Sequence, residues 1–394
     1  MTKRSFIFLI ITLGSLVAIG PLAIDMYLPA FSKIAQFFDA PDSKVQLTLS
    51  SYFIGIAVAQ IFYGPAIDRF GKKPPLIFGL ILFVIASYLC IIASSINEMI
   101  LWRFFQAAGA CSCFVVMRAI VRDLFSTKES AQVLSYLLLV MGIAPILAPI
   151  FGAIILDYFD WQAIFWFLAL FGLLLILVTV FYLPESRGGN KNEKISQSFK
   201  KYQEIISDKN FLFYSLAGGF SACGMFVYIT GAPYVLIEVF NLTPKAFSWV
   251  FSINALGYVA VAQINARFLK FFELHQVLNN AFKISLTAAI ALIICGVYFA
   301  NLITISIALF VYIALIGAIT PSSTALALSN QKKHSGSASA LFGSIQFTIC
   351  AFGALLISKF HNGTALPMML AMASCGITAF FINYYWQKIC LKKN

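Results

Sequence analysis

Residues 184–210 read PESRGGNKNEKISQSFKKYQEIISDKN, and this polar stretch divides a strongly apolar chain into two halves. Its paired glycines, its charges and its lack of a long apolar run are typical of a linker, with room for one amphipathic helix. On both sides of it, apolar runs of about 20 residues follow one another, which is the length that a helix needs to cross the hydrocarbon core of a bilayer. The linker therefore separates two sets of membrane spans.

The composition is that of a multi-span membrane protein. The chain has 394 residues, of which 61% are hydrophobic. That is about 240 residues, the number that twelve spans of about 20 residues would use. Only 11% of the residues are charged, which excludes an ordinary soluble enzyme, a disordered chain and a fibrous protein. The net charge of +12 does not indicate a nucleic-acid partner, because the basic residues are scattered between the apolar runs.

Six spans are predicted in each half. In the first half they cover residues 5–27, 46–66, 76–94, 98–121, 132–156 and 164–183. In the second half they cover residues 211–235, 247–266, 278–299, 304–326, 337–358 and 365–386. Because lipid offers backbone groups no hydrogen-bond partner, each run must be a helix. We therefore expect an all-α membrane protein with twelve transmembrane helices, divided into an N-terminal bundle at 1–183, a cytoplasmic linker at 184–210 and a C-terminal bundle at 211–394.

The basic residues predict the orientation in the membrane. Placing both termini in the cytoplasm puts 20 of the 27 lysines and arginines on the inside and four in outside loops. Cytoplasmic loops carry such an excess, so we expect a multi-pass protein of the bacterial cytoplasmic membrane with both termini inside. The apolar run that follows Lys3 and Arg4 is too long for the apolar region of a signal peptide and is expected to be the first span.

Cysteine and histidine usage indicates no metal site. The eight cysteines lie in apolar runs or close to the C-terminus, where thiols act as small hydrophobic groups. His275, His334 and His361 fall in predicted loops, and no CxxC pairs with a histidine at the spacing of metal ligands. We expect no cofactor and no disulfide framework. No catalytic constellation is visible either, so an enzyme is not expected.

A short repeat relates the two halves. Residues 57–61 in the second span read AVAQI, and residues 260–264 in the eighth span read AVAQI again. A glycine precedes each copy, at Gly55 and Gly257. Five shared letters can arise by chance, but both copies occupy the same place in their half. We therefore expect two pseudo-symmetric bundles, with a substrate cavity between them near the middle of the membrane.

Two charged residues fall inside predicted spans. Asp25 lies at the outer end of the first span, and Arg103 lies five residues after Glu98 in the fourth. A charge deep in a span costs about 2.5–3.5 kcal/mol on insertion scales, so a functional role is the default interpretation. The alternative is that both side chains extend to the outer interface. Gln106 lies one turn from Arg103 on the same face, where it can hold the guanidinium or contact a substrate.

The loop after the second span reads GPAIDRFGKKP at residues 64–74. It is not a phosphate-binding loop, because it lacks the GxxxxGK spacing followed by Ser or Thr, so ATP-driven transport is not expected. Asp68 can cap a helix, or pair with Arg69 and with a neighbouring span end such as Arg122 and Asp123. The alternative is a simple charged turn.

These residues carry a resemblance to a known family. Residues 64–73 resemble the signature G-x-x-x-D-R-x-G-[RK]-[RK] of the major facilitator superfamily, with Gly64, Asp68, Arg69 and Gly71 in place. Residues 101–109 resemble its fourth-span motif R-x-x-Q-x-x-G. Residues 25–29, DMYLP, resemble the opening of its drug:proton antiporters. The likeness covers nearly the whole chain and points to the Bcr/CflA subfamily.

The resemblance implies two six-helix bundles and secondary efflux of small, often amphipathic compounds, antibiotics included, driven by proton entry. The implied partners are a small-molecule substrate, protons and the bilayer, and we expect the chain to work as a monomer. The fifth-span motif G-x-x-x-G-P-x-x-G-G departs from this pattern, because Ala144 precedes Pro145, and Pro149 with Ile150 replaces the glycine pair. An alternative function is a proton-coupled exporter or symporter of a natural metabolite such as an amino acid or a peptide.

The expected coupling device is Asp25 together with Arg103. A dry site favours the protonated carboxyl and a nearby guanidinium favours the ionised one, so movement of the pair or arrival of substrate can switch its protonation. The candidates for substrate contact are polar or amphipathic span residues, namely Tyr27, Tyr52, Gln60, Gln106, Tyr228, Asn254 and Gln346. The candidates for conformational change are Gly64, Asp68, Arg69, Gly71, Arg122 and Asp123 near the loop, with Gly142, Pro145, Pro149 and Gly152 in the fifth span, where glycine and proline allow close packing and bending.

Overall fold

The structure is a computed structural model that describes residues 3–125, 127–183, 195–331, 335–360 and 363–391. Every regular element within these residues is a helix. Twelve of the helices are long and apolar enough to cross a membrane, and they coincide with the twelve predicted spans. The predicted fold class is confirmed.

The helices extend beyond the predicted spans by several residues at many of their ends. The first half contains α1 (Lys3–Asp25), the short η1 (Leu28–Ala30), α2 (Phe31–Phe37), α3 (Asp42–Phe70), α4 (Lys73–Ile91), α5 (Ile96–Leu124), α6 (Thr127–Tyr158) and α7 (Gln162–Tyr182). The second half contains α8 (Ile195–Ser207), α9 (Lys209–Pro233), η2 (Tyr234–Val239), α10 (Pro244–Phe268), α11 (Leu274–Tyr298), α12 (Leu302–Leu328), α13 (Ser335–Ile357) and α14 (Leu366–Leu391).

Local sequence explains some of the helix ends. α5 begins with a reciprocal cap, in which the Glu98 N–H donates to Ser95 Oγ at 3.3 Å and the Ser94 N–H donates to Glu98 Oε2 at 2.9 Å. α3 ends at Gly71, whose φ of +83° lies in the region that favours glycine. Gly71 is therefore required by the turn between α3 and α4.

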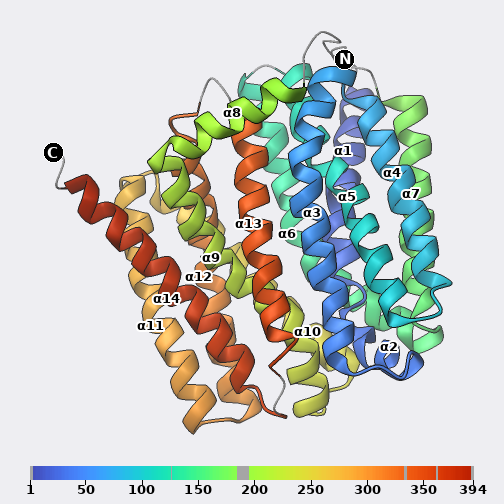
Figure 1. Cartoon of the computed structure of the whole chain (residues 1–394), viewed down its shortest axis with the longest axis vertical. Coiled ribbons are helices and arrows are strands. Elements are labelled where there is room, and N and C mark those ends of the chain that lie inside the picture. Colours follow the sequence, from blue (N-terminus) through green and yellow to red (C-terminus); the bar gives the residue numbers. More distant parts are fainter. Residues whose placement is uncertain (1–2, 126, 184–194, 332–334, 361–362, 392–394) are drawn as a thin grey trace.

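The long helices form two six-helix bundles (Figure 1). In the N-terminal bundle, α3 and α4 pack on α5, α7 packs on α4, and α1 packs on α6. In the C-terminal bundle, α9 packs against α12, α13 and α14, and α11 packs against α12 and α14. α8 lies at one end of the molecule and α2 at the opposite end, and we call these the α8 end and the α2 end. Residues 184–194 lie outside the described part, so the linker bounds stay a prediction.

Two seams join the bundles, one between α3 and α13 and the other between α6 and α10. At the first seam, Ser344 Oγ of α13 donates to the Ala57 carbonyl of α3 at 2.9 Å. Ala57 begins the first AVAQI copy, and the second copy lies in α10, a helix of the other seam. The sequence repeat thus places one copy in a seam helix of each bundle.

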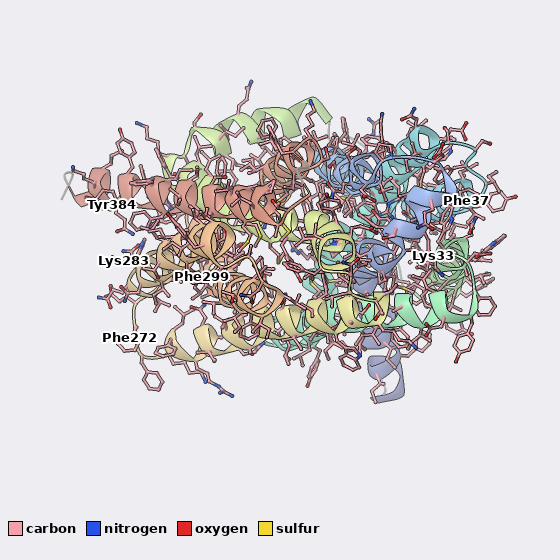
Figure 2. The ribbon with its side chains drawn as sticks, turned by 90° about the horizontal axis from the view of Figure 1, so that it is seen from below. Lys33, Phe37, Phe272, Lys283, Phe299 and Tyr384 are labelled. Carbon is pink, nitrogen blue, oxygen red and sulfur yellow. The ribbon has the colours of Figure 1, made fainter. Side chains whose placement is uncertain are left out.

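The outward faces of the bundles are covered by large apolar side chains. Phe78 of α4 is 66% exposed and Ile307 of α12 is 61% exposed, which suits contact with acyl chains. Figure 2 looks from the α2 end and shows Phe272 and Tyr384 pointing away from the molecule. With twelve apolar helices, the chain is a multi-pass membrane protein.

Candidate functional site

Arg103 forms the centre of the most polar site inside the N-terminal bundle. Its side chain is fully buried, and its Nη2 donates to the Ala23 carbonyl of α1 at 3.0 Å. Its Nη1 donates to Gln106 Oε1, one turn further along α5. The guanidinium carbon lies 4.2 Å from the ring centroid of Tyr27 and 4.4 Å from that of Tyr52. A desolvated cation over an aromatic face gains about 2 kcal/mol, so these two rings help to stabilise a charge that lipid would reject.

The elements that carry these groups are held in place by close packing. Gly55 of α3 lies directly against the Phe104 carbonyl of α5, so α3 approaches α5 closely and brings Tyr52 under the guanidinium. Tyr27 lies in the turn between α1 and η1, and its hydroxyl is 2.9 Å from Thr48 Oγ1 of α3. The predicted contact between Gln106 and Arg103 is present, and Gln106 Nε2 also donates to Ser87 Oγ of α4 at 2.7 Å.

Asp25 is the last residue of α1 and is also buried, with 3% of its surface exposed. Its Oδ1 accepts no hydrogen bond from the residues that the structure describes. Asp25 and Arg103 make no ion pair here, because the guanidinium donates instead to the carbonyl of Ala23, two residues before Asp25. Neither side chain extends to the outer interface, so the alternative reading of both residues does not hold in this structure.

A second polar pair lies across from Asp25 in the C-terminal bundle. Asn254 Nδ2 of α10 donates to the Tyr228 hydroxyl of α9 at 2.8 Å, and both residues are buried. The Tyr228 ring stacks on Phe251 with centroids 5.5 Å apart. Asp25 is next to Met26, whose backbone packs against Gly152 of α6, and α6 accepts a hydrogen bond from Ser248 of α10, so Asp25 lies beside the same seam. The structure thus brings three of the predicted residues, from both bundles, to one region between them.

The other two candidates for substrate contact lie on the α3–α13 seam. Gln60 of α3 packs against Gly343 of α13, and its Oε1 accepts no hydrogen bond from the described residues. Gln346 lies one turn further along α13, beside Gly219 of α9. The seven candidates therefore form three groups, around Arg103, around Asn254 and along this seam, and not one cluster.

The predicted loop at residues 64–74 is mostly helical, because α3 continues to Phe70 and α4 begins at Lys73. We keep the name 64–74 loop for this segment, which is tied to α5 and α7 at the α8 end. Lys72 pairs with Asp123 at the end of α5, and Lys73 Nζ donates to the Val180 carbonyl of α7 at 2.8 Å. Lys72 was not predicted as a partner of this span end, and the predicted pairing of Asp68 with it stays a prediction. Arg69 lies over the Phe70 ring, with 5.3 Å between the guanidinium carbon and the ring centroid. The Arg122 side chain lies outside the described part.

Helix α8 closes this end of the first seam. The Tyr202 hydroxyl of α8 donates to the Ile61 carbonyl of α3 at 3.2 Å and lies against Gly64. Burial, and next the Asp68 carboxylate, raise the pKa of Tyr202 to about 12, so its hydroxyl keeps its proton and remains a donor. Gly64 and Asp68 are thus brought together beside the linker helix.

The four predicted residues of α6 lie along the second seam. Gly142 faces Val259 of α10, and Gly152 lies against the Met26 backbone next to Asp25. Pro145 and Pro149 are both interior to the helix. Carbonyls beside them accept hydrogen bonds from α10, where Ser248 Oγ donates to Pro149 at 2.9 Å and Ser252 Oγ donates to Ile146 at 2.6 Å. These serines were not predicted from the sequence, although their four-residue spacing places them on one helix face.

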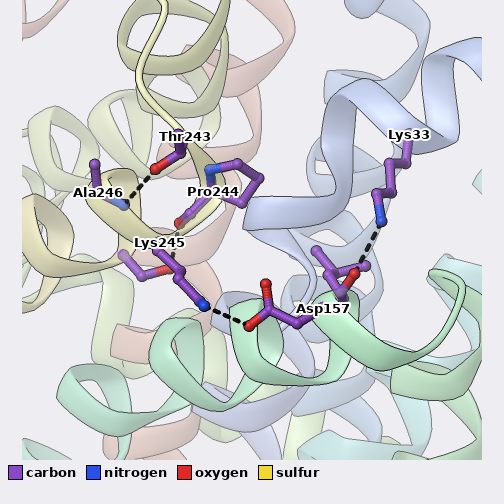
Figure 3. A network of polar contacts seen from close by, with 8 residues as sticks. Lys33, Asp157, Thr243, Pro244, Lys245 and Ala246 are labelled. Atoms are coloured by element: carbon purple, nitrogen blue, oxygen red, sulfur yellow. Dashed lines mark hydrogen bonds and ion pairs between the residues drawn. The ribbon is translucent and has the colours of Figure 1, made fainter.

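Charged residues join the bundles at the α2 end (Figure 3). Lys245 Nζ of α10 lies 2.8 Å from Asp157 Oδ2 of α6, and Lys33 Nζ donates to the Leu156 carbonyl at 3.0 Å. Ser32 also contacts Glu238 near the end of η2. In the sequence, Lys33 and Lys245 counted only as basic residues of predicted outside loops. Lys245 joins α10 to α6 of the other bundle, whereas Lys33 ties α2 to α6 within the N-terminal bundle.

Comparisons with known proteins agree with this architecture. A family model described as Major Facilitator Superfamily matches residues 13–354. The chain is 33% identical over 387 residues to an uncharacterized MFS-type transporter of Bacillus subtilis, YdgK, with 96% of each protein covered. It is 29% identical over 385 residues to a bicyclomycin resistance protein homolog of Haemophilus influenzae, covering 97% of this chain and 96% of that one. The multidrug resistance protein MdtL of Escherichia coli is 32% identical over 241 residues, 61% of each chain.

Solved structures show the same fold. The chain matches a bacterial homolog of the human lysosomal transporter Spinster with a TM-score of 0.75 at 14% identity, over 100% of this chain and 99% of that one. It matches the xylose transporter XylE of E. coli with a TM-score of 0.74 at 15% identity, over 98% of each chain.

Proposed function

The chain belongs to the Major Facilitator Superfamily, a family of transporters and not of enzymes, and from this premise we propose that it exports small amphipathic compounds, antibiotics among them, in exchange for protons. Two similar proteins, named for bicyclomycin resistance and for multidrug resistance, support this substrate class. The many aromatic and apolar side chains between the helices, with a few polar groups near Asn254, suit weakly selective binding of such compounds.

The observation that carries the proton coupling is the buried carboxyl of Asp25. An ionised carboxylate in a dry site needs a cation or several hydrogen-bond donors, and Asp25 Oδ1 has neither among the described residues. The carboxyl therefore carries a proton in this conformation. Because Asp25 precedes Met26, which packs against α6 at its seam with α10, the surroundings of the carboxyl depend on how the bundles are placed.

A change of hydrogen-bond partner for the Arg103 guanidinium switches the protonation state of Asp25. The guanidinium now donates to the Ala23 carbonyl, on the helix that ends with Asp25. A small shift of α1 relative to α5 brings the Asp25 carboxyl to the same donors, and the positive charge then favours release of its proton. Arrival of a substrate between the bundles drives this shift when it binds the shifted arrangement more tightly.

Alternating access requires the seams to open at one end at a time. Hydrogen bonds of Ser248 and Ser252 to α6 hold the bundles together in one seam, while Ser344 holds them in the other. We place the α8 end in the cytoplasm and the α2 end outside, with both termini inside the bacterial cytoplasmic membrane and one chain as the working unit. The positive-inside bias of the loops supports this orientation.

The energy available from one proton is sufficient for export. One positive charge that crosses with the membrane potential releases about 2.3 kcal/mol per 100 mV. At about 1.36 kcal/mol per decade, this sustains roughly a fiftyfold substrate gradient. A single carboxyl that is protonated on one side and deprotonated on the other is therefore an adequate coupling device.

The test is Asp25→Asn in energised inverted vesicles. Asparagine keeps the shape of the side chain but cannot carry a proton, so we expect substrate-dependent proton release to be lost and drug tolerance of a pump-deficient host to fall to that of the empty vector. The measurement is vesicle pH with phenicols, bicyclomycin-like compounds and fluoroquinolones as candidate substrates.

Asp39→Asn is the matched control. Asp39 is an exposed carboxyl with a φ of +46°, a conformation that asparagine adopts equally well, so we expect this variant to transport like the wild type. Wild-type tolerance in cells that express Asp25→Asn would refute the coupling role of Asp25. Proton movement in the same direction as the substrate would refute antiport.

A further inference from the structure

The N-terminal bundle has an apolar groove on its outward face, away from both seams. The groove has a volume of about 530 Å³ and lies between α3, α4 and α5. Its lining is Gly55, Val58, Ala59, Phe62, Tyr63, Ala66, Phe70, Pro74, Pro75, Phe78, Leu82, Phe104, Phe105 and Ala108. None of the seven candidates for substrate contact belongs to this set, although Gly55 and Phe104, whose packing places Tyr52 under Arg103, lie at its inner wall.

The residues that line the groove suit contact with an extended apolar chain. Gly55, Ala59 and Ala108 contribute small side chains to its lining. The rings of Phe62 and Phe78, which are 56% and 66% exposed, also line it. It follows α3 from Gly55, near the middle of that helix, to the loop that begins after Phe70 at the α8 end. Its length therefore runs along the direction in which acyl chains lie in one leaflet.

A basic side chain stands at the α8 end of the groove. Phe70 lines the groove, and the Arg69 guanidinium lies 5.3 Å from the centroid of its ring. Arg69 makes no ion pair with any residue that the structure describes. Lys73 precedes two lining residues, Pro74 and Pro75, and adds a second positive charge at this end. A guanidinium is suited to bidentate recognition of a phosphate, so the charge complements an anionic group at the mouth of an apolar channel.

We propose that this groove binds one anionic phospholipid, with an acyl chain along α3 between Phe62 and Phe78 and the phosphate on Arg69. The headgroup then lies beside the 64–74 loop, which is tied to α5 through Lys72 and to α7 through Lys73. The bound lipid couples the composition of the leaflet to the position of this loop. The proposal does not depend on proton coupling, because it uses neither Asp25 nor Arg103.

The test is native mass spectrometry of the full chain, released from membranes that contain equal amounts of phosphatidylglycerol and phosphatidylethanolamine with the same acyl chains. We expect the wild type to retain one phosphatidylglycerol about tenfold more often than phosphatidylethanolamine. Both lipids offer a phosphate to Arg69, but phosphatidylglycerol has a net negative charge, whereas the ammonium of phosphatidylethanolamine offsets its phosphate and is repelled by Arg69 and Lys73. Arg69→Gln is expected to remove this preference, and Arg69→Lys to restore part of it. Val58→Trp fills the groove and is expected to lower the retention of both lipids.

Ile253→Trp is the matched control for the groove. Ile253 is an exposed β-branched residue of α10 in the other bundle and lies outside the groove. Its replacement by tryptophan should therefore leave lipid retention unchanged. Equal retention by Val58→Trp and Ile253→Trp would overturn the proposal, as would a wild type without headgroup preference. If Val58→Trp lowers drug binding or self-association while lipid retention stays constant, the occupant is a substrate tail or a second copy, and the phospholipid is excluded.

Discussion

Arg103 shows how one buried cation is stabilised without a carboxylate. Its Nη1 and Nη2 donate to Gln106 and to a backbone carbonyl, and its faces are covered by the rings of Tyr27 and Tyr52. Its Nε has no hydrogen-bond partner among the described residues. The two tyrosines differ in one respect. The Thr48 hydroxyl donates to Val45, so the Tyr27 hydroxyl must be the donor in its bond to Thr48, whereas the Tyr52 hydroxyl has no partner among the described residues.

This difference predicts that two matched substitutions change the stability of the protein differently. Tyr27→Phe removes a buried hydrogen bond and is expected to destabilise the protein by about 0.5–1.5 kcal/mol, measured by thermal unfolding in detergent. Tyr52→Phe keeps the ring under the guanidinium and removes a hydroxyl without a partner, so we expect unchanged or slightly higher stability. If Tyr52 contacts substrate, the same variant also lowers substrate affinity. Equal destabilisation by both variants would contradict this assignment of the hydrogen bonds.

Helix α6 contacts α10 of the other bundle and α1 of its own bundle. One face of it accepts hydrogen bonds from Ser248 and Ser252 of α10, and Gly152 lies against the backbone of Met26. Gly142, on the same helix, faces the side chain of Val259. The nearest atom to a methyl group placed on Gly142 would be a Val259 methyl carbon at 3.1 Å. The two glycines therefore differ in whether the neighbouring group can move aside.

We predict that Gly152→Ala destabilises the protein by about 1–3 kcal/mol, because a methyl group there meets backbone and forces α6 and the Asp25 turn apart. Gly142→Ala, the matched control, is expected to have a smaller effect, since Val259 can change its rotamer. Both are measured by the fraction of monodisperse protein that survives heating in detergent. A Gly142→Ala variant that is less stable than Gly152→Ala would contradict the packing described here.

At the scale of the whole molecule, the α2 end is held by the ion pair of Asp157 with Lys245 (Figure 3). The contact of Ser32 with Glu238 also holds this end. Each contact joins the two bundles. The ion pair is solvent-exposed, so its strength falls as salt rises. It therefore acts as a weak latch between the bundles at this end.

We predict that Asp157→Asn makes this end open more often. The expected result is faster hydrogen–deuterium exchange of backbone amides in α2 and the first turns of α10 at low salt, and a smaller difference from the wild type at high salt. Exchanging the charges with Asp157→Lys and Lys245→Asp together should restore the protection. If the charge-exchanged protein exchanges as fast as the single variant, the ion pair is not the latch.

Several parts of the site were predictable from the sequence. Asp25, Arg103 and Gln106 stood out because charged and amide side chains are rare in apolar spans, and the structure buries all three. The Gln106 contact followed from helical spacing. The partner of Asp123 and the serines of α10 were not predicted, because each depends on which helices are neighbours across the membrane.

The sequence by itself determined twelve membrane-spanning helices and the burial of Asp25 and Arg103, since these follow from the exclusion of polar groups by lipid along the chain. Only the tertiary structure decided that the Arg103 guanidinium packs against two tyrosine rings and donates to the Ala23 carbonyl, and that it does not pair with Asp25. Hydropathy specifies which segments enter the membrane. The partners of a buried charge are set by the packing of α1, α3 and α5 against one another, which the order of residues along the chain does not encode locally.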